Sequence, residues 1–315
     1  MSTTIQTVTL SSKGHFGRNV PPKAFGELLR AIPDAIRLSV RMAFESRSRA
    51  TGKLPKWLAP ASDIRFLDHG GHDETFLHFE VPRLGDAAAE IYRQQELWPT
   101  RPDPEDTGFD LLGDVISDVA ASDVDSERFD RPLLRQIERF SRGLNGTFQR
   151  LAFPGNRFSQ AQPVVINSAV IGAASKLCHG TPEPQQTRVA GKLDMIRSST
   201  NTFAIKLKDG QDIHGVLNEG KIADFKGLLE QNVLVLGKAV YRPSGKLLRI
   251  DADHVSAAAE WDQFFSTIPK PKRSRFDLRG VLREQQHKNG MTAVFGKWPG
   301  NETDEQIAAA LREMS

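Results

Sequence analysis

The sequence predicts an α+β protein: a mixed N-terminal domain, a small five-stranded β-barrel and a C-terminal extension with a short helix. Three observations support this expectation. Apolar residues recur at helical spacing in much of the first half of the chain. Short alternating segments separated by turn residues follow from residue 187 onward. The last residues combine a basic, proline-containing connector with a capped helical pattern.

The composition favours a folded cytoplasmic protein. The chain has 315 residues, 39% of them hydrophobic and 26% charged, which is enough for about two or three compact domains. Its one cysteine, Cys178, excludes an internal disulfide and favours a reducing compartment. No segment approaches the ~20 apolar residues of a membrane span, and the start lacks the apolar core of a signal peptide. We therefore expect neither export nor a membrane partner.

The N-terminal part divides into a flexible polar start, residues 1–20, and an α+β domain, residues 21–155. Pro21 and Pro22 open a helical pattern that extends to residue 44. Pro33 is expected to kink this helix or split it in two. The arginines of this region, among them Arg41, are expected on the solvated face of the helix. A strand hairpin and two further helical patterns follow before the domain ends.

Residues 156–186 are expected to be a linker region, and residues 187–256 an OB-like barrel. Five strand-like segments lie in the barrel range: 188–196, 202–207, 212–217, 233–241 and 247–255. A short helical pattern separates the third segment from the fourth. Three strands, a helix and two strands is the order of the OB-fold, a small Greek-key barrel. SH3-like barrels and plain five-stranded sheets share parts of this order and remain alternatives.

An OB-fold binds ligands across its second and third strands, between the loop joining strands 1 and 2 and the loop joining strands 4 and 5. Cations and aromatic rings fall at those places in this chain: Arg197, Phe203, Lys206, Lys208, His214, Tyr241, Arg242 and Lys246. Cations neutralise phosphate and flat rings stack on bases, so a nucleic-acid-binding barrel is one hypothesis. A rigid docking module is the competing interpretation.

Residues 257–315 are predicted to form a helix and a C-terminal tail. A basic connector, 269–275, leads to a Trp-Pro-Gly sequence at 298–300. Thr303 and Gln306 have the spacing of a capping box at the start of a final helix. That helix is too short to be stable alone in water, so we expect its apolar strip to bind a surface.

The segment 295–307, FGKWPGNETDEQI, resembles the C-terminal tail of bacterial antitoxins that pair with PIN-domain ribonuclease toxins. The resemblance covers residues 276–315, and it implies a strap that neutralises the toxin by protein contact. The implied partner-binding residues are Lys297, Trp298, Pro299, Ile307, Leu311 and Arg312. Among them, Trp298 and Leu311 would be anchors, and the two cations would approach the acidic metal site of the toxin. The chain departs from the family in lacking its N-terminal DNA-binding motif.

Charge is distributed unevenly along the chain, although the net charge is only +3. Residues 103–130 are markedly acidic, whereas residues 188–283 are rich in lysine and arginine. Such regions either present separate faces to unlike partners or meet inside one molecule. Asp110, Asp114 and Asp118 lie four apart, and we expect them on a solvated helix face rather than in a metal-dependent nuclease site.

The leading hypothesis from sequence is therefore a non-enzymatic, antitoxin-like inhibitor of a PIN-type nuclease in a bacterial toxin–antitoxin system. Common nucleotide, hydrolase and zinc motifs are absent, and no cofactor is expected. Nucleic-acid binding through the barrel is the first alternative. A metal-dependent enzyme built on the N-terminal domain is the second. Its weak metal candidates, His69, His72 and His78, lie around an ordinary Gly-Gly turn.

Overall fold

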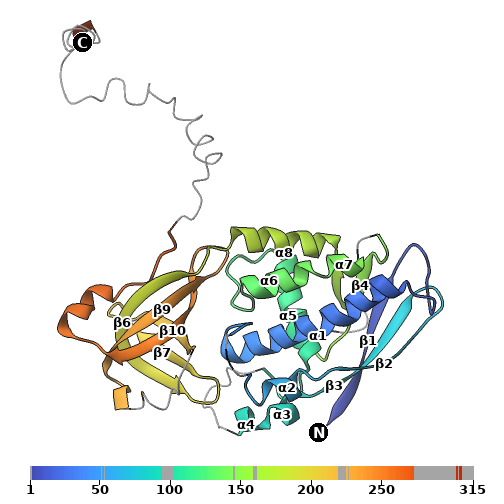
Figure 1. The fold of residues 1–315 in the computed structure, drawn as a ribbon, viewed down its shortest axis with the longest axis horizontal. Coiled ribbons are helices and arrows are strands. Elements are labelled where there is room, and N and C mark those ends of the chain that lie inside the picture. Colours follow the sequence, from blue (N-terminus) through green and yellow to red (C-terminus); the bar gives the residue numbers. More distant parts are fainter. Residues whose placement is uncertain are drawn as a thin grey trace. The chain divides into compact units, whose positions relative to one another are not determined.

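A computed structural model describes most of the chain up to residue 272. The described residues are 2–50, 52, 54–93, 102–144, 146–158, 162–218, 225, 227–272, 303, 305 and 306. Contacts between Cα atoms divide the chain into two units, Met1–Lys272 and Arg273–Ser315. Both the sheet and the barrel belong to the first unit (Figure 1). The structure is thus an α+β protein with a closed barrel, as the sequence predicts.

The first layer is a five-stranded sheet in the order β2-β3-β1-β4-β5, and all of its neighbouring strands are antiparallel. Its strands are β1 (Thr3–Ser11), β2 (Arg65–Gly70), β3 (Thr75–Pro82), β4 (Arg150–Phe153) and β5 (Val164–Asn167). The expected flexible start, residues 1–20, is therefore wrong, because it contains the central strand. Val8 and Leu10 are buried on one face of β1, but Gln6 is buried on the same face and Ile5 is exposed, so the apolar alternation is broken.

Helices pack beside this sheet (Figure 1). The longer ones are α1 (Pro22–Glu45), α5 (Gly108–Ala120), α6 (Arg131–Glu138) and α8 (Ser168–Gly180). The short ones are α2 (Leu58–Ala61), α3 (Leu84–Ala87), α4 (Ala89–Tyr92) and α7 (Ser141–Leu144). Helix α1 continues through Pro33, so that proline does not split it. The expected linker, residues 156–186, is also wrong over much of its length, since it contributes β5 and α8 to the packed core.

The barrel consists of five strands closed in the order β10-β8-β7-β6-β9. They are β6 (Gln185–Arg197), β7 (Thr202–Lys206), β8 (Asp212–Leu217), β9 (Asn232–Tyr241) and β10 (Leu247–Ala257). The first strand pairs with both the second and the fourth, and the third and fifth strands run parallel. Closure with this strand order confirms the OB-like prediction and excludes an open five-stranded sheet.

The chain returns along the barrel after β10. A 3-10 helix, η2 (Glu260–Phe265), replaces the expected longer helix, and Ile268 then packs against the barrel core. The backbone N–H of Lys272 donates to the side chain of Gln185 (2.9 Å), which in turn donates to the Lys272 carbonyl (3.1 Å). The returning segment is thereby fixed to the start of β6. None of the helices in the described part of the chain combines the length and apolar character that a membrane span needs.

The predicted final helix lies almost entirely outside the described residues. Within it, Glu305 and Gln306 are helical. The Gln306 side chain accepts from the Thr303 N–H (2.8 Å), and the Gln306 N–H donates to the Thr303 carbonyl (2.9 Å). The first bond is one half of the predicted capping box, and the second is a backbone bond between the same two residues. The predicted partner-binding residues Lys297, Trp298, Pro299, Ile307, Leu311 and Arg312 are outside the described residues.

Candidate nucleic-acid interface

The two aromatic rings predicted as base-stacking platforms are buried. Phe203 is 2% exposed and belongs to the barrel core, where it lies against Gly215, a position at which any Cβ would come within 2.2 Å of the Phe203 ring. Tyr241 is 1% exposed, and burial raises the pKa of its hydroxyl. Neither ring can stack on a base in this structure, so the sequence assigned both residues to the wrong side of the barrel.

The cations of the β9–β10 turn are also engaged. The Nη1 group of Arg242 donates to the Asp125 carbonyl (2.9 Å), and its Nη2 group pairs with Glu127. The Nζ group of Lys246 donates to Asp125 Oδ2 (2.8 Å). Acidic and basic regions of the sequence therefore meet inside this molecule, which was one of the two expectations from their distribution. Arg197 is half-buried at the end of β6.

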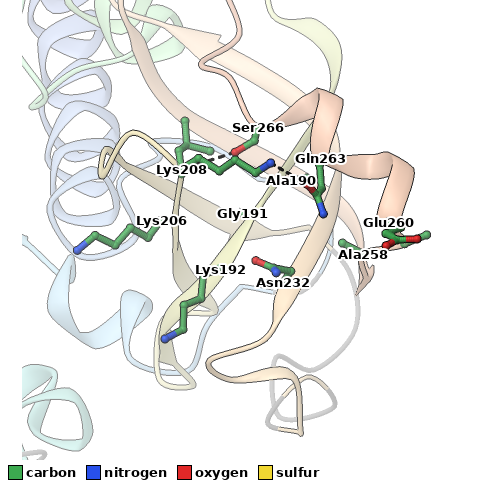
Figure 2. A pocket seen from close by; sticks show the side chains of 12 residues that line it. Ala190, Gly191, Lys192, Lys206, Lys208, Asn232, Ala258, Glu260, Gln263 and Ser266 are labelled. Carbon is green, nitrogen blue, oxygen red and sulfur yellow. Dashed lines mark hydrogen bonds between the residues drawn. The ribbon is translucent and has the colours of Figure 1, made fainter.

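Lys206 and Lys208 are exposed and lie together with Lys192 around an open cavity of about 380 Å³ (Figure 2). Lys192 is on β6 and Lys206 is on β7, and they face each other directly in the antiparallel pairing of these two strands. Glu260 and Gln263 of η2 line the same cavity. It therefore lies between the barrel strands and the short helix that follows the barrel.

Two large rings project from η2, and neither is among the residues that line this cavity. Trp261 is 71% exposed and Phe264 is 86% exposed. Residues three apart eclipse one another in a 3-10 helix, so the two rings share one face of η2. In the sequence the two aromatic residues are three apart, but only the 3-10 helix and their observed exposure show that both rings face solvent. We call Lys192, Lys206, Lys208, Trp261 and Phe264 the lysine–aromatic surface.

The short helix is held in place by polar contacts. Asp262 caps it, because its Oδ2 accepts from the Ala259 N–H (2.7 Å). The Lys208 side chain donates to Gln263 Oε1 (2.8 Å), and the Lys208 N–H donates to Ser266 Oγ (3.3 Å). These bonds fix η2 to the barrel end, and its outward rings are therefore presented on an ordered element.

The histidines of the β2–β3 hairpin do not converge. His69 Nε2 lies 3.2 Å from the Arg18 carbonyl, whereas His72 pairs with Asp73 (3.4 Å). His78 Nε2 lies 3.9 Å from a carboxylate oxygen of Asp68, which is exposed like much of the hairpin. No group of three or more metal-ligating side chains comes together among the described residues. The hairpin thus offers no metal centre that the geometry supports.

The aspartates of α5 are not on a solvated face, contrary to the expectation. Asp110 is fully buried and caps the helix start. Asp114 pairs with Arg157 (2.8 Å), and Asp118 pairs with Arg128 (3.0 Å). Burial raises the pKa of Asp114, and the nearby arginines offset part of that effect. Asp114 and Asp118 are thus paired with arginines outside α5, and Asp110 accepts from Thr107 at the start of its own helix, so these contacts stabilise the fold.

No protein-family model matches this chain, and the search of curated proteins finds no match. The structure by itself defines the class: an α+β protein that carries an OB-like barrel with a lysine–aromatic surface.

Proposed function

We propose that the barrel binds single-stranded nucleic acid over the lysine–aromatic surface. The observation that carries this proposal is the exposure of Trp261 and Phe264, 71% and 86%, on an ordered helix beside three exposed lysines. Large rings are normally buried, because each removes much apolar area from water, and a paired exposure favours a binding surface. Stacking rings next to phosphate-neutralising cations are the two elements that single strands require.

Single strands fit this surface better than duplexes do. The faces of bases in a duplex are covered by their neighbours, whereas unpaired bases can stack on protein side chains. The surface is small and mixed in charge, since Glu260 also lines the cavity. We therefore expect weak sequence preference and an affinity that falls as the salt concentration rises.

Replacing both rings, Trp261→Ala with Phe264→Ala, is expected to weaken binding by about 2–6 kcal/mol, at least roughly 30-fold. Fluorescence anisotropy with a labelled single-stranded oligonucleotide, at low salt, measures this change. Both side chains are mostly exposed, so the variant should fold normally. Leu67→Ala, a truncation of an exposed apolar side chain on the sheet, is the control and should bind like wild type. Unchanged affinity in the double variant, or no wild-type binding at low salt, contradicts the proposal.

A second proposal is inhibition of a PIN-type nuclease by the tail, residues 276–315. Its support is the resemblance of the tail to antitoxins, together with the hydrogen bonds between Thr303 and Gln306 that begin a capped helix. The tail also falls in the unit Arg273–Ser315, separate from the unit that contains the sheet and barrel. In this proposal, Trp298 and Leu311 bury their apolar side chains against the nuclease.

Co-expression with a PIN-type nuclease encoded by a neighbouring gene tests the second proposal. Deletion of residues 276–315 is expected to abolish both complex formation and growth protection, because the anchors are lost. Trp298→Ala should weaken the complex, whereas Trp261→Ala serves as the matched control and should protect fully. Protection that survives the deletion would rule out the inhibitor function.

A further inference from the structure

The β9–β10 turn, residues 242–246, joins the fourth and fifth strands of the barrel, a position that borders the ligand path in OB-folds. In this structure residues 122–130, which we call the acidic loop, contact this turn. The loop follows α5 and ends at Asp130, the N-cap of α6. A segment of the same chain therefore lies where a nucleic-acid ligand would contact the rim of the barrel.

The acidic loop contacts the turn with the groups that a phosphate would use. Asp125 Oδ2 accepts from Lys246 Nζ at 2.8 Å, and the Glu127 carboxylate pairs with the Arg242 guanidinium. Negative oxygens at hydrogen-bond distance from lysine and arginine are also what a nucleic-acid backbone supplies. The backbone adds a bond from the Ser244 N–H to the Val124 carbonyl (3.0 Å).

The lysine and the two carboxylates in these contacts are exposed and therefore exchangeable, whereas the Arg242 side chain is 19% exposed. The side chains of Lys246 and Asp125 are 67% and 44% exposed, and that of Glu127 is 69% exposed. Exposed ion pairs contribute little to stability, so replacing one anion by another costs little. Hydrogen bonds from Lys246 and Ser244 lower the pKa of Asp125, which favours its charged form. The ion pairs of the loop with the turn can thus break while the end of the loop stays fixed by the buried Asp130.

An open cavity of about 740 Å³ extends the ligand path from the turn. Glu127, His214, Arg242 and Lys246 line it, as does the returning segment at residues 268–271. That same returning segment begins at Ser266, which lines the cavity of the lysine–aromatic surface. The two cavities are therefore bordered by neighbouring residues of one stretch of chain.

We propose that the acidic loop competes with single-stranded nucleic acid for Arg242 and Lys246, so that it limits binding to the lysine–aromatic surface until a longer strand displaces it. This inference rests on the proposed nucleic-acid function and adds a regulatory element to the same site. Short strands need only the lysine–aromatic surface. Longer strands gain two further phosphate contacts once the loop carboxylates are displaced.

The test is the double variant Asp125→Asn with Glu127→Gln, which keeps side-chain shape and the backbone contacts but removes two negative charges. A matched control, Asp63→Asn with Glu80→Gln, makes the same charge change at the ion pairs with Arg65 on the sheet. Affinity for a labelled oligo(dT) of about 16 nucleotides is measured by anisotropy over a range of salt concentrations. We expect the loop variant to bind roughly tenfold more tightly at low salt, with a salt slope steeper by about 1.4, or 0.7 per added phosphate contact.

The control separates competition from a general change in charge, because it should alter affinity less and leave the slope unchanged. Equal affinity gains and equal slopes in the two double variants overturn the inference. The inference also fails if wild-type binding depends on Trp261 and Phe264 but the loop variant gains no affinity. In that case the proposed function stands. Absence of binding by both the wild type and the loop variant removes the proposed function and the inference together.

Discussion

Replacing Asp130 with alanine is expected to lower the free energy of unfolding by about 3–5 kcal/mol. Asp130 is fully buried between the helices and the barrel, and its Oδ2 lies 3.2 Å from Arg249 Nη2. The same carboxylate accepts from the backbone N–H of Ser48 (3.0 Å) and from the Ser48 hydroxyl. It also caps α6 by accepting from the Leu133 N–H (3.3 Å). Its loss leaves a buried guanidinium without one of its two carboxylate partners.

The charge of Arg249 makes this loss costly. Burial alone would lower the pKa of Arg249, but the carboxylates of Asp251 and Asp130 outweigh it and hold the pKa above its ordinary value. The guanidinium therefore stays charged in the folded protein. Urea denaturation followed by circular dichroism measures the effect, with Asp130→Asn as a variant that keeps the shape and part of the cap. Asp125→Asn, an exposed aspartate on the same loop, is the control and should change stability little. A loss below about 1 kcal/mol for Asp130→Ala would show that the buried pair does not join the helices to the barrel.

Truncating Phe203 to alanine is expected to destabilise the protein by about 3–5 kcal/mol, because it empties the centre of the barrel. The facing backbone at Gly215 has no side chain with which to fill the space. The conservative variant Phe203→Leu should fold and bind nucleic acid with wild-type affinity, since the ring does not reach the surface.

Trp261→Ala should show the opposite behaviour, with normal stability and reduced affinity. Urea denaturation and anisotropy on the same preparations give both quantities. A Phe203→Leu protein that is stable but binds more weakly would instead place Phe203 at the ligand and contradict its burial.

The barrel strands were predictable because short-range sequence patterns mark each of them. Turn residues and alternating strands mark each segment, and the predicted strand 188–196 lies within β6. By contrast, β1 gains its stability from pairing with β3 and β4, strands that follow much later in the chain. Helix α8 was missed because its sequence is rich in small residues, which give a weak apolar stripe until they pack against the other helices.

The site was predictable only in part, because sequence spacing does not show which side of a closed barrel a residue faces. Lys206 and Lys208 are exposed at the predicted place, whereas Phe203 points inward. Arg41 illustrates the same limit on a helix. It was expected in solvent but is 5% exposed, and its Nε donates to the buried Glu45 (2.9 Å) one turn further along α1. Burial of a charge there depends on a partner that one helical pattern cannot reveal.

The pair of hydrogen bonds between Gln185 and Lys272 has a topological consequence. The chain enters and leaves the barrel at neighbouring residues, so residues 185–272 form a module whose two ends are adjacent. Modules of this kind can be exchanged or transplanted without redirecting what precedes or follows them, because their two ends already meet. The chain therefore leaves the barrel at Lys272, next to the residue at which it entered.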